Sequence, residues 1–119
     1  MSLQVKSQVI KNPDGKIKYR KLNPDGSEHF HLGVWVDGST SELKTIHSVD
    51  YELHPSFRNP MRHSENLENK FGITFWTWDM FDIAVTVTLK NGTEQHLDYY
   101  LSYDLPPDDG TNYIESQDG

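Results

Sequence analysis

Cysteine is absent from the 119 residues of the sequence, so disulfide bonds, thiolate metal sites and cysteine nucleophiles are all excluded. The sequence also lacks any apolar run of about 18 residues, the length that a membrane-spanning helix needs. It has no basic start followed by an apolar stretch, which is the pattern of a secretory signal. We therefore expect a soluble, cytoplasmic protein that makes no contact with a membrane.

Basic residues are also scarce, with 11 Lys and Arg against 18 Asp and Glu, and the net charge is −7. The charge is unevenly distributed along the chain. Residues 1–22 hold six Lys or Arg and one Asp, whereas residues 104–119 hold five Asp or Glu and no Lys or Arg. An acidic chain binds duplex phosphates poorly, because that affinity comes from neutralising backbone charge. We therefore expect no strong nucleic-acid binding.

Helical periodicity is missing too, whereas short runs of alternating apolar and polar residues are frequent. Two copies of Asn-Pro-Asp-Gly, at 12–15 and 23–26, predict turns. Proline presets φ, and glycine readily adopts the left-handed conformation at the end of the turn. The expected strands are residues 16–22, 29–37, 43–53, 71–77, 81–90 and 93–103. This pattern predicts an all-β, immunoglobulin-like β-sandwich of about seven to eight antiparallel strands.

The sandwich domain is expected to occupy residues 1–103, and an acidic, irregular tail to occupy residues 104–119. Within the tail, Tyr113 and Ile114 are the only residues expected to dock on the domain. Residues 55–70 contain two prolines and little apolar content, so we expect them to form a long connection.

Two details of strand register follow from the alternation. In residues 43–53, Ile46 has the opposite parity to Val49 and the apolar residues after it, so a β-bulge at His47-Ser48 is expected to return Ile46 to the core.

The second detail is the loop between the last two strands. A two-residue Asn-Gly turn would set Val85 opposite Asp98, whereas a three-residue loop at 90–92 sets Val85 opposite Leu97. The longer loop also pairs Ile83 with Tyr99 and Phe81 with Leu101. Burying both apolar rows on one face stabilises the fold by several kcal/mol, so we expect this loop, with Gly92 left-handed.

One possible chemistry is nucleophilic catalysis. His54 and Ser56 are two residues apart across a proline, and a Ser–His pair is the core of an activated nucleophile. A serine hydrolase also needs an orienting acid and oxyanion donors, and the sequence has no G-x-S-x-G elbow. We therefore do not expect a serine hydrolase.

A metal site on histidines is a second possibility. His29 and His31 point the same way from one expected strand, and His47, His63 and His96 are candidates for a third ligand. The sequence assigns no carboxylate that would complete the metal site. Histidine on the solvent-exposed face of a strand is more often solvated than bound to a metal. We expect no metal.

Recognition of a flat group is a third possibility. Phe57 follows a strand end, and Trp76, Trp78 and Phe81 surround a second turn. Two rings on neighbouring loops form a slot for a planar group, because stacked π-faces attract by about 0.5–1.5 kcal/mol. A hydroxyl and an imidazole from residues 54–56 would orient an amide there. The alternative is that these rings belong to the core.

Two stretches, VDYELHPSF (followed by RNP and MR) and KFGITFWTWDMFDIAVTVTL, resemble the YEATS domain, and more closely the prokaryotic YEATS-like group. The resemblance runs from about residue 29 to residue 103. It implies an immunoglobulin-fold binding module with no enzyme activity and no cofactor. In eukaryotic members, loops at one end of the sandwich read acetylated or crotonylated lysine in histone tails, with the flat acyl-amide between two aromatic rings.

The resemblance also implies roles for individual residues. Phe57 and Trp78 would be the two rings, and Ser56 would bond the amide. His54 would support the first loop, and Phe81 would form the floor of the channel. The whole implied ligand site is His54, Ser56, Phe57, Thr77, Trp78, Asp79 and Phe81.

The second turn departs from the family pattern, in which a small residue stands beside the second ring, as in G-W-G-E-F. Here the turn is Thr77-Trp78-Asp79-Met80-Phe81, and the bulkier neighbours of the ring restrict the approach of the backbone, although Thr77 and Asp79 would still offer backbone groups. The carboxylate of Asp79 would favour a ligand with Lys or Arg next to the modified residue. An additional channel ring of the family has no clear match, and His29 or Phe30 lies nearest.

The implied partner is therefore a protein or peptide that bears an acyl-lysine and is not a eukaryotic histone. A different function remains open from the residues themselves. The chain could be a sandwich-type protein–protein interaction module that uses the His29, His31 and Trp35 face, because Trp35 points away from the apolar row of its strand.

Overall fold

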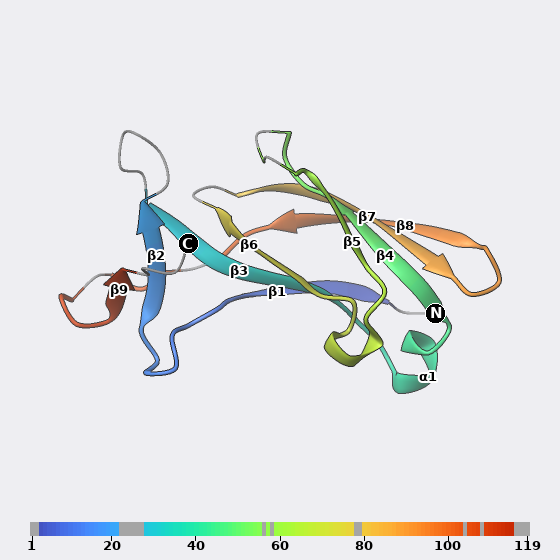
Figure 1. Cartoon of the computed structure of the whole chain (residues 1–119), viewed down its shortest axis with the longest axis horizontal. Coiled ribbons are helices and arrows are strands. Elements are labelled where there is room, and N and C mark those ends of the chain that lie inside the picture. The colour runs from blue at the N-terminus through green and yellow to red at the C-terminus, as the bar shows by residue number, and fades with distance from the viewer. Residues whose placement is uncertain are drawn as a thin grey trace.

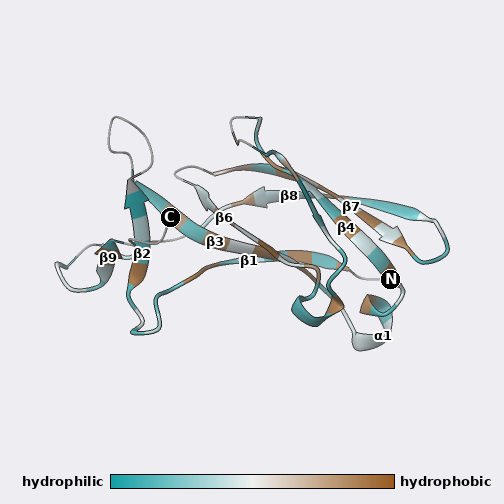
Figure 2. Cartoon of the chain, viewed as in Figure 1, coloured by the Kyte–Doolittle hydropathy of each residue, from teal (hydrophilic) through white to brown (hydrophobic). Residues whose placement is uncertain are grey.

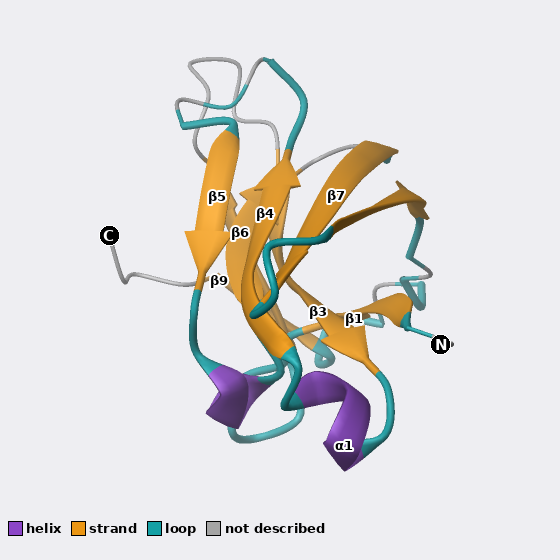
Figure 3. Cartoon of the chain, turned by 90° about the vertical axis from the view of Figure 1, so that its right-hand side faces the viewer, coloured by secondary structure: helices purple, strands orange, loops and turns teal. Residues whose placement is uncertain are grey.

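The structure of the chain, a computed structural model, describes residues 3–21, 28–55, 57, 59–77, 80–103, 105–107 and 109–115. These residues form nine strands in two facing sheets, with two short helical turns at one end (Figures 1 and 3). The expected immunoglobulin-like β-sandwich is confirmed, with one more strand than the upper expectation. Neither helical turn has the length or the apolar composition that crossing a bilayer requires.

The first sheet is built around one long central strand, β3 (Glu28–Asp37). Strand β2 pairs with the start of β3, β1 pairs with its second half, and β6 pairs with its middle, all antiparallel. Strand β9 adds to β2 in parallel. The bounds of the other strands are β1 Gln4–Val9, β2 Ile17–Lys21, β6 Ile73–Thr77 and β9 Tyr113–Glu115.

The second sheet is antiparallel, in the order β5-β4-β7-β8. The bounds of its strands are β4 Ile46–Glu52, β5 Met61–Ser64, β7 Phe81–Leu89 and β8 Glu94–Leu101. Along β7 every second residue is buried, which is the pattern of a strand with one face on a core and one in solvent. Apolar and polar residues alternate visibly along β4 and β7 (Figure 2).

The core lies between the two sheets and is formed by their inward-facing side chains. Its fully buried members include Leu32 and Val34 from β3, Tyr51 from β4 and Ile83 from β7. A polar contact also links the two layers, because Ser7 Oγ of β1 lies 2.6 Å from the Tyr99 hydroxyl of β8.

Both register predictions are confirmed. Val85 pairs with Leu97, and the β7–β8 connection has Gly92 at φ +88°, the left-handed conformation that glycine adopts at low cost. In β4 the register shifts between Ile46 and Ser48, so the chain has a bulge there and Ile46 is only 3% exposed.

The expected start of a strand at residue 43 is wrong. Residues Thr40–Leu43 form a short helix, α1, and β4 begins only at Ile46. The helix starts in a capping box, in which the Ser39 hydroxyl accepts from the Glu42 amide and the Glu42 carboxylate accepts from the Ser39 amide.

The expected long connection at 55–70 is also more ordered than predicted. It contains strand β5 and a 3-10 turn, Leu67–Asn69. The turn ends with Lys70 and Phe71 at φ +59° and +58°, so β6 starts at Ile73, later than predicted.

The turn at 12–15 is confirmed, with the Gly15 amide donating to the Asn12 carbonyl at 2.8 Å. The second predicted turn, at 23–26, lies outside the described residues. In the tail, Tyr113 and Ile114 dock by forming β9 against β2.

Candidate functional site

The two segments singled out in the sequence meet at one end of the sandwich. Strands β4 and β7 are antiparallel neighbours, with Glu52 paired to Ala84, so the end of β4 lies beside the beginning of β7. The described residues that follow β4 and the beginning of β7 therefore come together. They lie at the end opposite to α1 (Figure 1).

A tight turn positions Phe57 at this end. The Phe57 amide donates to the His54 carbonyl at 3.0 Å, which folds the ring back toward the sandwich. Its centroid lies 5.3 Å from that of Phe81, at the start of β7, and 5.6 Å from that of Phe75, in β6. Phe75 and Phe81 are buried, whereas Phe57 is only half-buried. Phe57 thus keeps one surface exposed above a floor of two rings.

His54 and Thr77 differ in how far they reach solvent. The His54 ring is exposed and meets Phe81 edge to face, with centroids 6.3 Å apart. Thr77 is 1% exposed and pairs with Phe30, so its side chain is part of the core and it contributes to the turn through its backbone.

The structure therefore brings His54, Phe57 and Phe81 together and places Thr77 at the entry of the second turn. The predicted site residues Ser56, Trp78 and Asp79 lie outside the described residues.

Two aromatic residues near the site were not assigned a role in it. Phe75 completes the cluster of rings under Phe57. Its position on the inward face of a short alternating strand was the sequence signal that could have assigned it to the cluster. Phe30, one of the two positions nearest to the missing channel ring, is half-buried and pairs with Thr77 at the same end of the first sheet. His29, the other, is 3% exposed.

The His29 and His31 pair considered for a metal site is not brought together with the candidates for its third ligand. His29 and His31 belong to the first sheet, whereas His47, His63 and His96 belong to the second. Among the described residues, no group of three or more His, Asp or Glu is arranged to hold a metal ion.

The outward face of the first sheet has its own aromatic residues. Trp35 is half-buried and borders a hollow of about 310 Å³ above Gly33. His31 stacks on Trp76 with centroids 4.6 Å apart, and the Arg20 guanidinium lies 5.1 Å from the Trp76 ring centre. Burial lowers the pKa of His31, and the charges of neighbouring basic residues lower it further.

Comparisons with known proteins agree with this architecture. The model of the prokaryotic YEATS domain matches residues 30–102, which is more than half of the chain. Among curated proteins, none matches the sequence significantly.

Three solved structures of yeast Yaf9 share the fold. The structure of the yeast AF-9 homologue Yaf9 is 21% identical, with a TM-score of 0.60 over 87% of this chain and 66% of that one. The Yaf9 YEATS domain recognising an H3K122suc peptide is 22% identical, with a TM-score of 0.58 over 83% and 68%. The Yaf9 YEATS domain bound to H3K27ac is 22% identical, with a TM-score of 0.53 over 89% and 76%.

At this level of identity the solved structures show a shared fold, and the family match covers both segments of the candidate site. The chain is a member of the prokaryotic YEATS domain family.

Proposed function

We propose that this chain is a non-enzymatic binding module whose end loops hold an acylated lysine, acetylated or crotonylated, or a similar flat amide on a protein or peptide. The observation that carries the proposal is the position of Phe57. Its ring is half-buried and rests on Phe75 and Phe81, which precede and follow Trp78 in the sequence. The named ligands of the Yaf9 YEATS domains, acylated histone H3 peptides, support the same class of ligand.

In the proposed site, Phe57 and Trp78 stack on the two faces of the acyl-amide. The Ser56 hydroxyl bonds the amide, and the His54 imidazole supports the first loop. Phe81 closes the bottom of the slot. Thr77 and Asp79 offer backbone groups, which explains how a buried Thr77 side chain is compatible with a role in binding.

The physical basis of selectivity is the change that acylation makes to lysine. An ammonium group is charged and strongly hydrated, so removing its water is costly. Acylation replaces it with a flat, neutral amide, which loses less on desolvation and presents two π-faces to the rings. No bond needs to form or break, which fits a binding module.

The test is a titration with acetyl-lysine and crotonyl-lysine peptides, followed by tryptophan fluorescence, of the wild type and the variants Phe57→Ala and Trp78→Ala. We expect saturable binding to the wild type and about a fivefold or greater loss of affinity in each variant, because each removes one face of the slot, worth about 1 kcal/mol or more. Trp35→Ala is the matched control, since it removes a tryptophan from the outward face of the first sheet and should leave the affinity unchanged.

Circular dichroism of each variant separates binding from folding. An unfolded Trp78→Ala protein would mean that Trp78 is a core residue and would remove the main support for the slot. No response of the wild type at millimolar peptide would contradict the proposal outright.

A module that holds a protein partner without acyl-lysine binding is the second candidate. The observation in its favour is the half-buried Trp35 beside the hollow over Gly33. A ligand whose binding depends on Trp35 and is indifferent to Phe57 would favour this second function.

A further inference from the structure

Gly33 lies in the middle of the first sheet, at a position where the fold itself does not require glycine. It pairs with Gln8 of β1 on one side and with Thr74 of β6 on the other, and its φ is not left-handed. A β-carbon there would meet ordinary van der Waals contacts, the nearest being Ile10 Cδ1 at 3.4 Å. Glycine weakens the interior of a strand, and it often marks a place where a ligand approaches the backbone closely.

The outward surface of the sheet is hollowed above this glycine. The hollow has a volume of about 310 Å³, within the range of roughly 300–1,000 Å³ that small-molecule sites occupy. We call it the Gly33 hollow. Its walls are formed by an aromatic ring, two aliphatic side chains and three neutral polar side chains: Trp35, Ile10, Ile73, Gln8, Asn69 and Thr74. None of the described residues that line it carries a charge.

The polar groups of the Gly33 hollow are available to a ligand. The Asn69 side-chain oxygen accepts from the Gly72 amide at 3.2 Å, which holds the side chain in place, whereas the Asn69 NH₂ group donates to no described residue. The side chains of Gln8 and Thr74 are exposed and also form no hydrogen bond with any described residue. The hollow therefore combines an aromatic wall with donors and acceptors of hydrogen bonds that the fold does not use.

A second hollow adjoins the first across Trp35. It also has a volume of about 310 Å³, and the two hollows share Gln8, Trp35 and Asn69. Glu68 and Lys70 complete the lining of the second one. A ligand built of two linked units therefore has room for one unit on each side of the tryptophan.

A protein segment suits this surface less well than a small molecule does. Strand β3 is paired on both sides at Gly33, so it offers no free edge to which a peptide strand can add. A stable protein interface buries about 800 Å² of each partner, whereas the Gly33 hollow has the size of a small-molecule site.

We propose that the Gly33 hollow binds a neutral sugar ring, and that a second, linked ring occupies the neighbouring hollow. One face of a sugar ring is formed by C–H groups, whose slight positive charge is attracted to the negative face of an indole. The hydroxyl groups around its edge both donate and accept, so they match the side chains of Asn69, Gln8 and Thr74. This site is separate from the end loops, and the proposal does not depend on acyl-lysine binding.

The test is a titration of the full chain with neutral sugars, followed by NMR of backbone amides and of the tryptophan indoles. The probes are methyl glucoside, methyl galactoside, methyl mannoside and methyl xyloside, each up to about 50 mM, because a single ring is expected to bind with roughly millimolar affinity. We expect at least one of them to give saturable shifts at Gly33, Gly72 and the Trp35 indole. The matching disaccharide, from cellobiose, lactose, mannobiose and xylobiose, should bind about tenfold more tightly, because its second ring adds contacts.

Three variants test the Gly33 hollow itself. Thr74→Val removes a hydroxyl group at nearly constant shape and should weaken sugar binding by about threefold to tenfold. Gly33→Ala puts a methyl group where the ring would lie and should weaken binding by about fivefold or more. Trp35→Ala should abolish it. The matched control is Thr88→Val, the same change on the outward face of the second sheet, which should leave the affinity unchanged.

Urea denaturation separates a loss of binding from a loss of folding. Alanine is more favourable than glycine inside a strand, so the Gly33→Ala protein should unfold at no lower urea concentration than the wild type while it binds sugar less tightly. Acetyl-lysine peptide binding, measured at a saturating sugar concentration, should be unchanged, so each site can fail without the other.

Several outcomes would overturn the proposal. One is the absence of saturable shifts at Gly33 and Trp35 with all four monosaccharides and all four disaccharides. Another is sugar binding that Thr74→Val and Gly33→Ala leave intact. Glucose 6-phosphate that binds more tightly than methyl glucoside would show that the hollow does not select a neutral ligand. A neutral peptide that shifts the same amides where no sugar does would replace the sugar with a protein segment.

Discussion

At the scale of single residues, Tyr51 is the largest fully buried side chain among the described residues. Its hydroxyl donates to the Phe71 carbonyl at 2.7 Å, and burial raises the pKa of the phenol, so the donor keeps its proton. Phe71 and the preceding Lys70 both have positive φ, which is rare for residues other than glycine. The buried Phe71 ring and the Tyr51 hydrogen bond together hold this strained segment in place.

We predict that Tyr51→Phe lowers the free energy of unfolding by about 1–3 kcal/mol, because it leaves the buried Phe71 carbonyl without its donor. Urea denaturation measures the change. Tyr100→Phe, which removes a hydroxyl from a side chain 57% exposed, should alter the free energy by less than about 0.5 kcal/mol. Equal effects from the two variants would mean that the hydrogen bond contributes nothing specific.

The alternation of apolar and polar residues predicted which face of a strand many side chains occupy. It predicted the backbone conformation of single residues only in part. The outward position of Trp35 and the inward position of Phe81 followed from alternation, and both hold. The left-handed Phe71 did not follow, because its conformation depends on packing and on a hydrogen bond from a residue 20 positions away.

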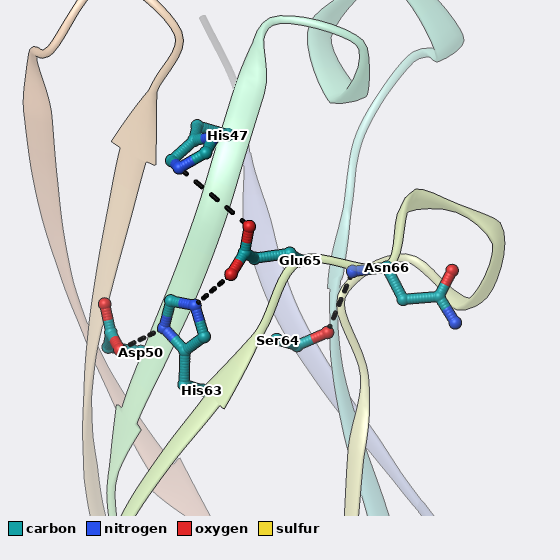
Figure 4. A network of polar contacts seen from close by, with 6 residues as sticks. All are labelled: His47, Asp50, His63, Ser64, Glu65 and Asn66. Atoms are coloured by element: carbon teal, nitrogen blue, oxygen red, sulfur yellow. Dashed lines mark hydrogen bonds and ion pairs between the residues drawn. The ribbon is translucent and has the colours of Figure 1, made fainter.

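At the scale of elements, the edge strand β5 is fastened by a network of charges (Figure 4). His63 of β5 has Nδ1 2.7 Å from Asp50 Oδ1 and Nε2 3.0 Å from Glu65 Oε2, and Glu65 also faces His47 at 4.0 Å. A neutral imidazole donates from only one nitrogen, so two carboxylate contacts require the protonated ring. The hydrogen bond to Asp50, and then that to Glu65, raises the pKa of His63 above its ordinary value of 6.5.

Because the pKa of His63 is raised, its ion pairs with Asp50 and Glu65 stabilise the fold fully below pH 6.5. This stabilisation is lost as the pH rises through the pKa of the folded state. We predict that the His63 ring titrates above pH 6.5 by NMR, and that β5 amides exchange faster once it has lost its proton. Asp50→Asn should lower the midpoint, whereas Glu28→Gln, a neutralisation in the other sheet, should leave it unchanged. A midpoint at the ordinary value in the wild type would contradict the network.

The elements were predicted best where the periodicity was long. Strands β7 and β8, with their loop, followed from nine or eight alternating residues each. Strand β5 was missed because Met-Arg-His-Ser has no alternating apolar row, as an edge strand with an exposed face needs none. Helix α1 was missed because it has only four residues, although its Ser-x-x-Glu capping box was readable.

At the scale of the whole molecule, the candidate site depends on how the two sheets close. Phe57 contacts Phe75 of the first sheet and Phe81 of the second, so it bridges the layers at one end of the sandwich. The sequence predicted the fold and singled out the two segments of the candidate site. It did not predict this bridge, because the bridge arises from tertiary pairing of β4 with β7 and from a ring, Phe75, that belongs to the facing layer.

In the proposed function, ligands bind between the two end loops. This binding is tested most directly by mapping backbone amide shifts while the protein is titrated with a neutral acetyl-lysine peptide. We expect the largest shifts in residues 53–57 and 77–81, with little change in α1 or at the β7–β8 loop. Saturable shifts around Gly33 and Trp35, with none at the two end loops, would contradict it and would place recognition on the outward face of the first sheet.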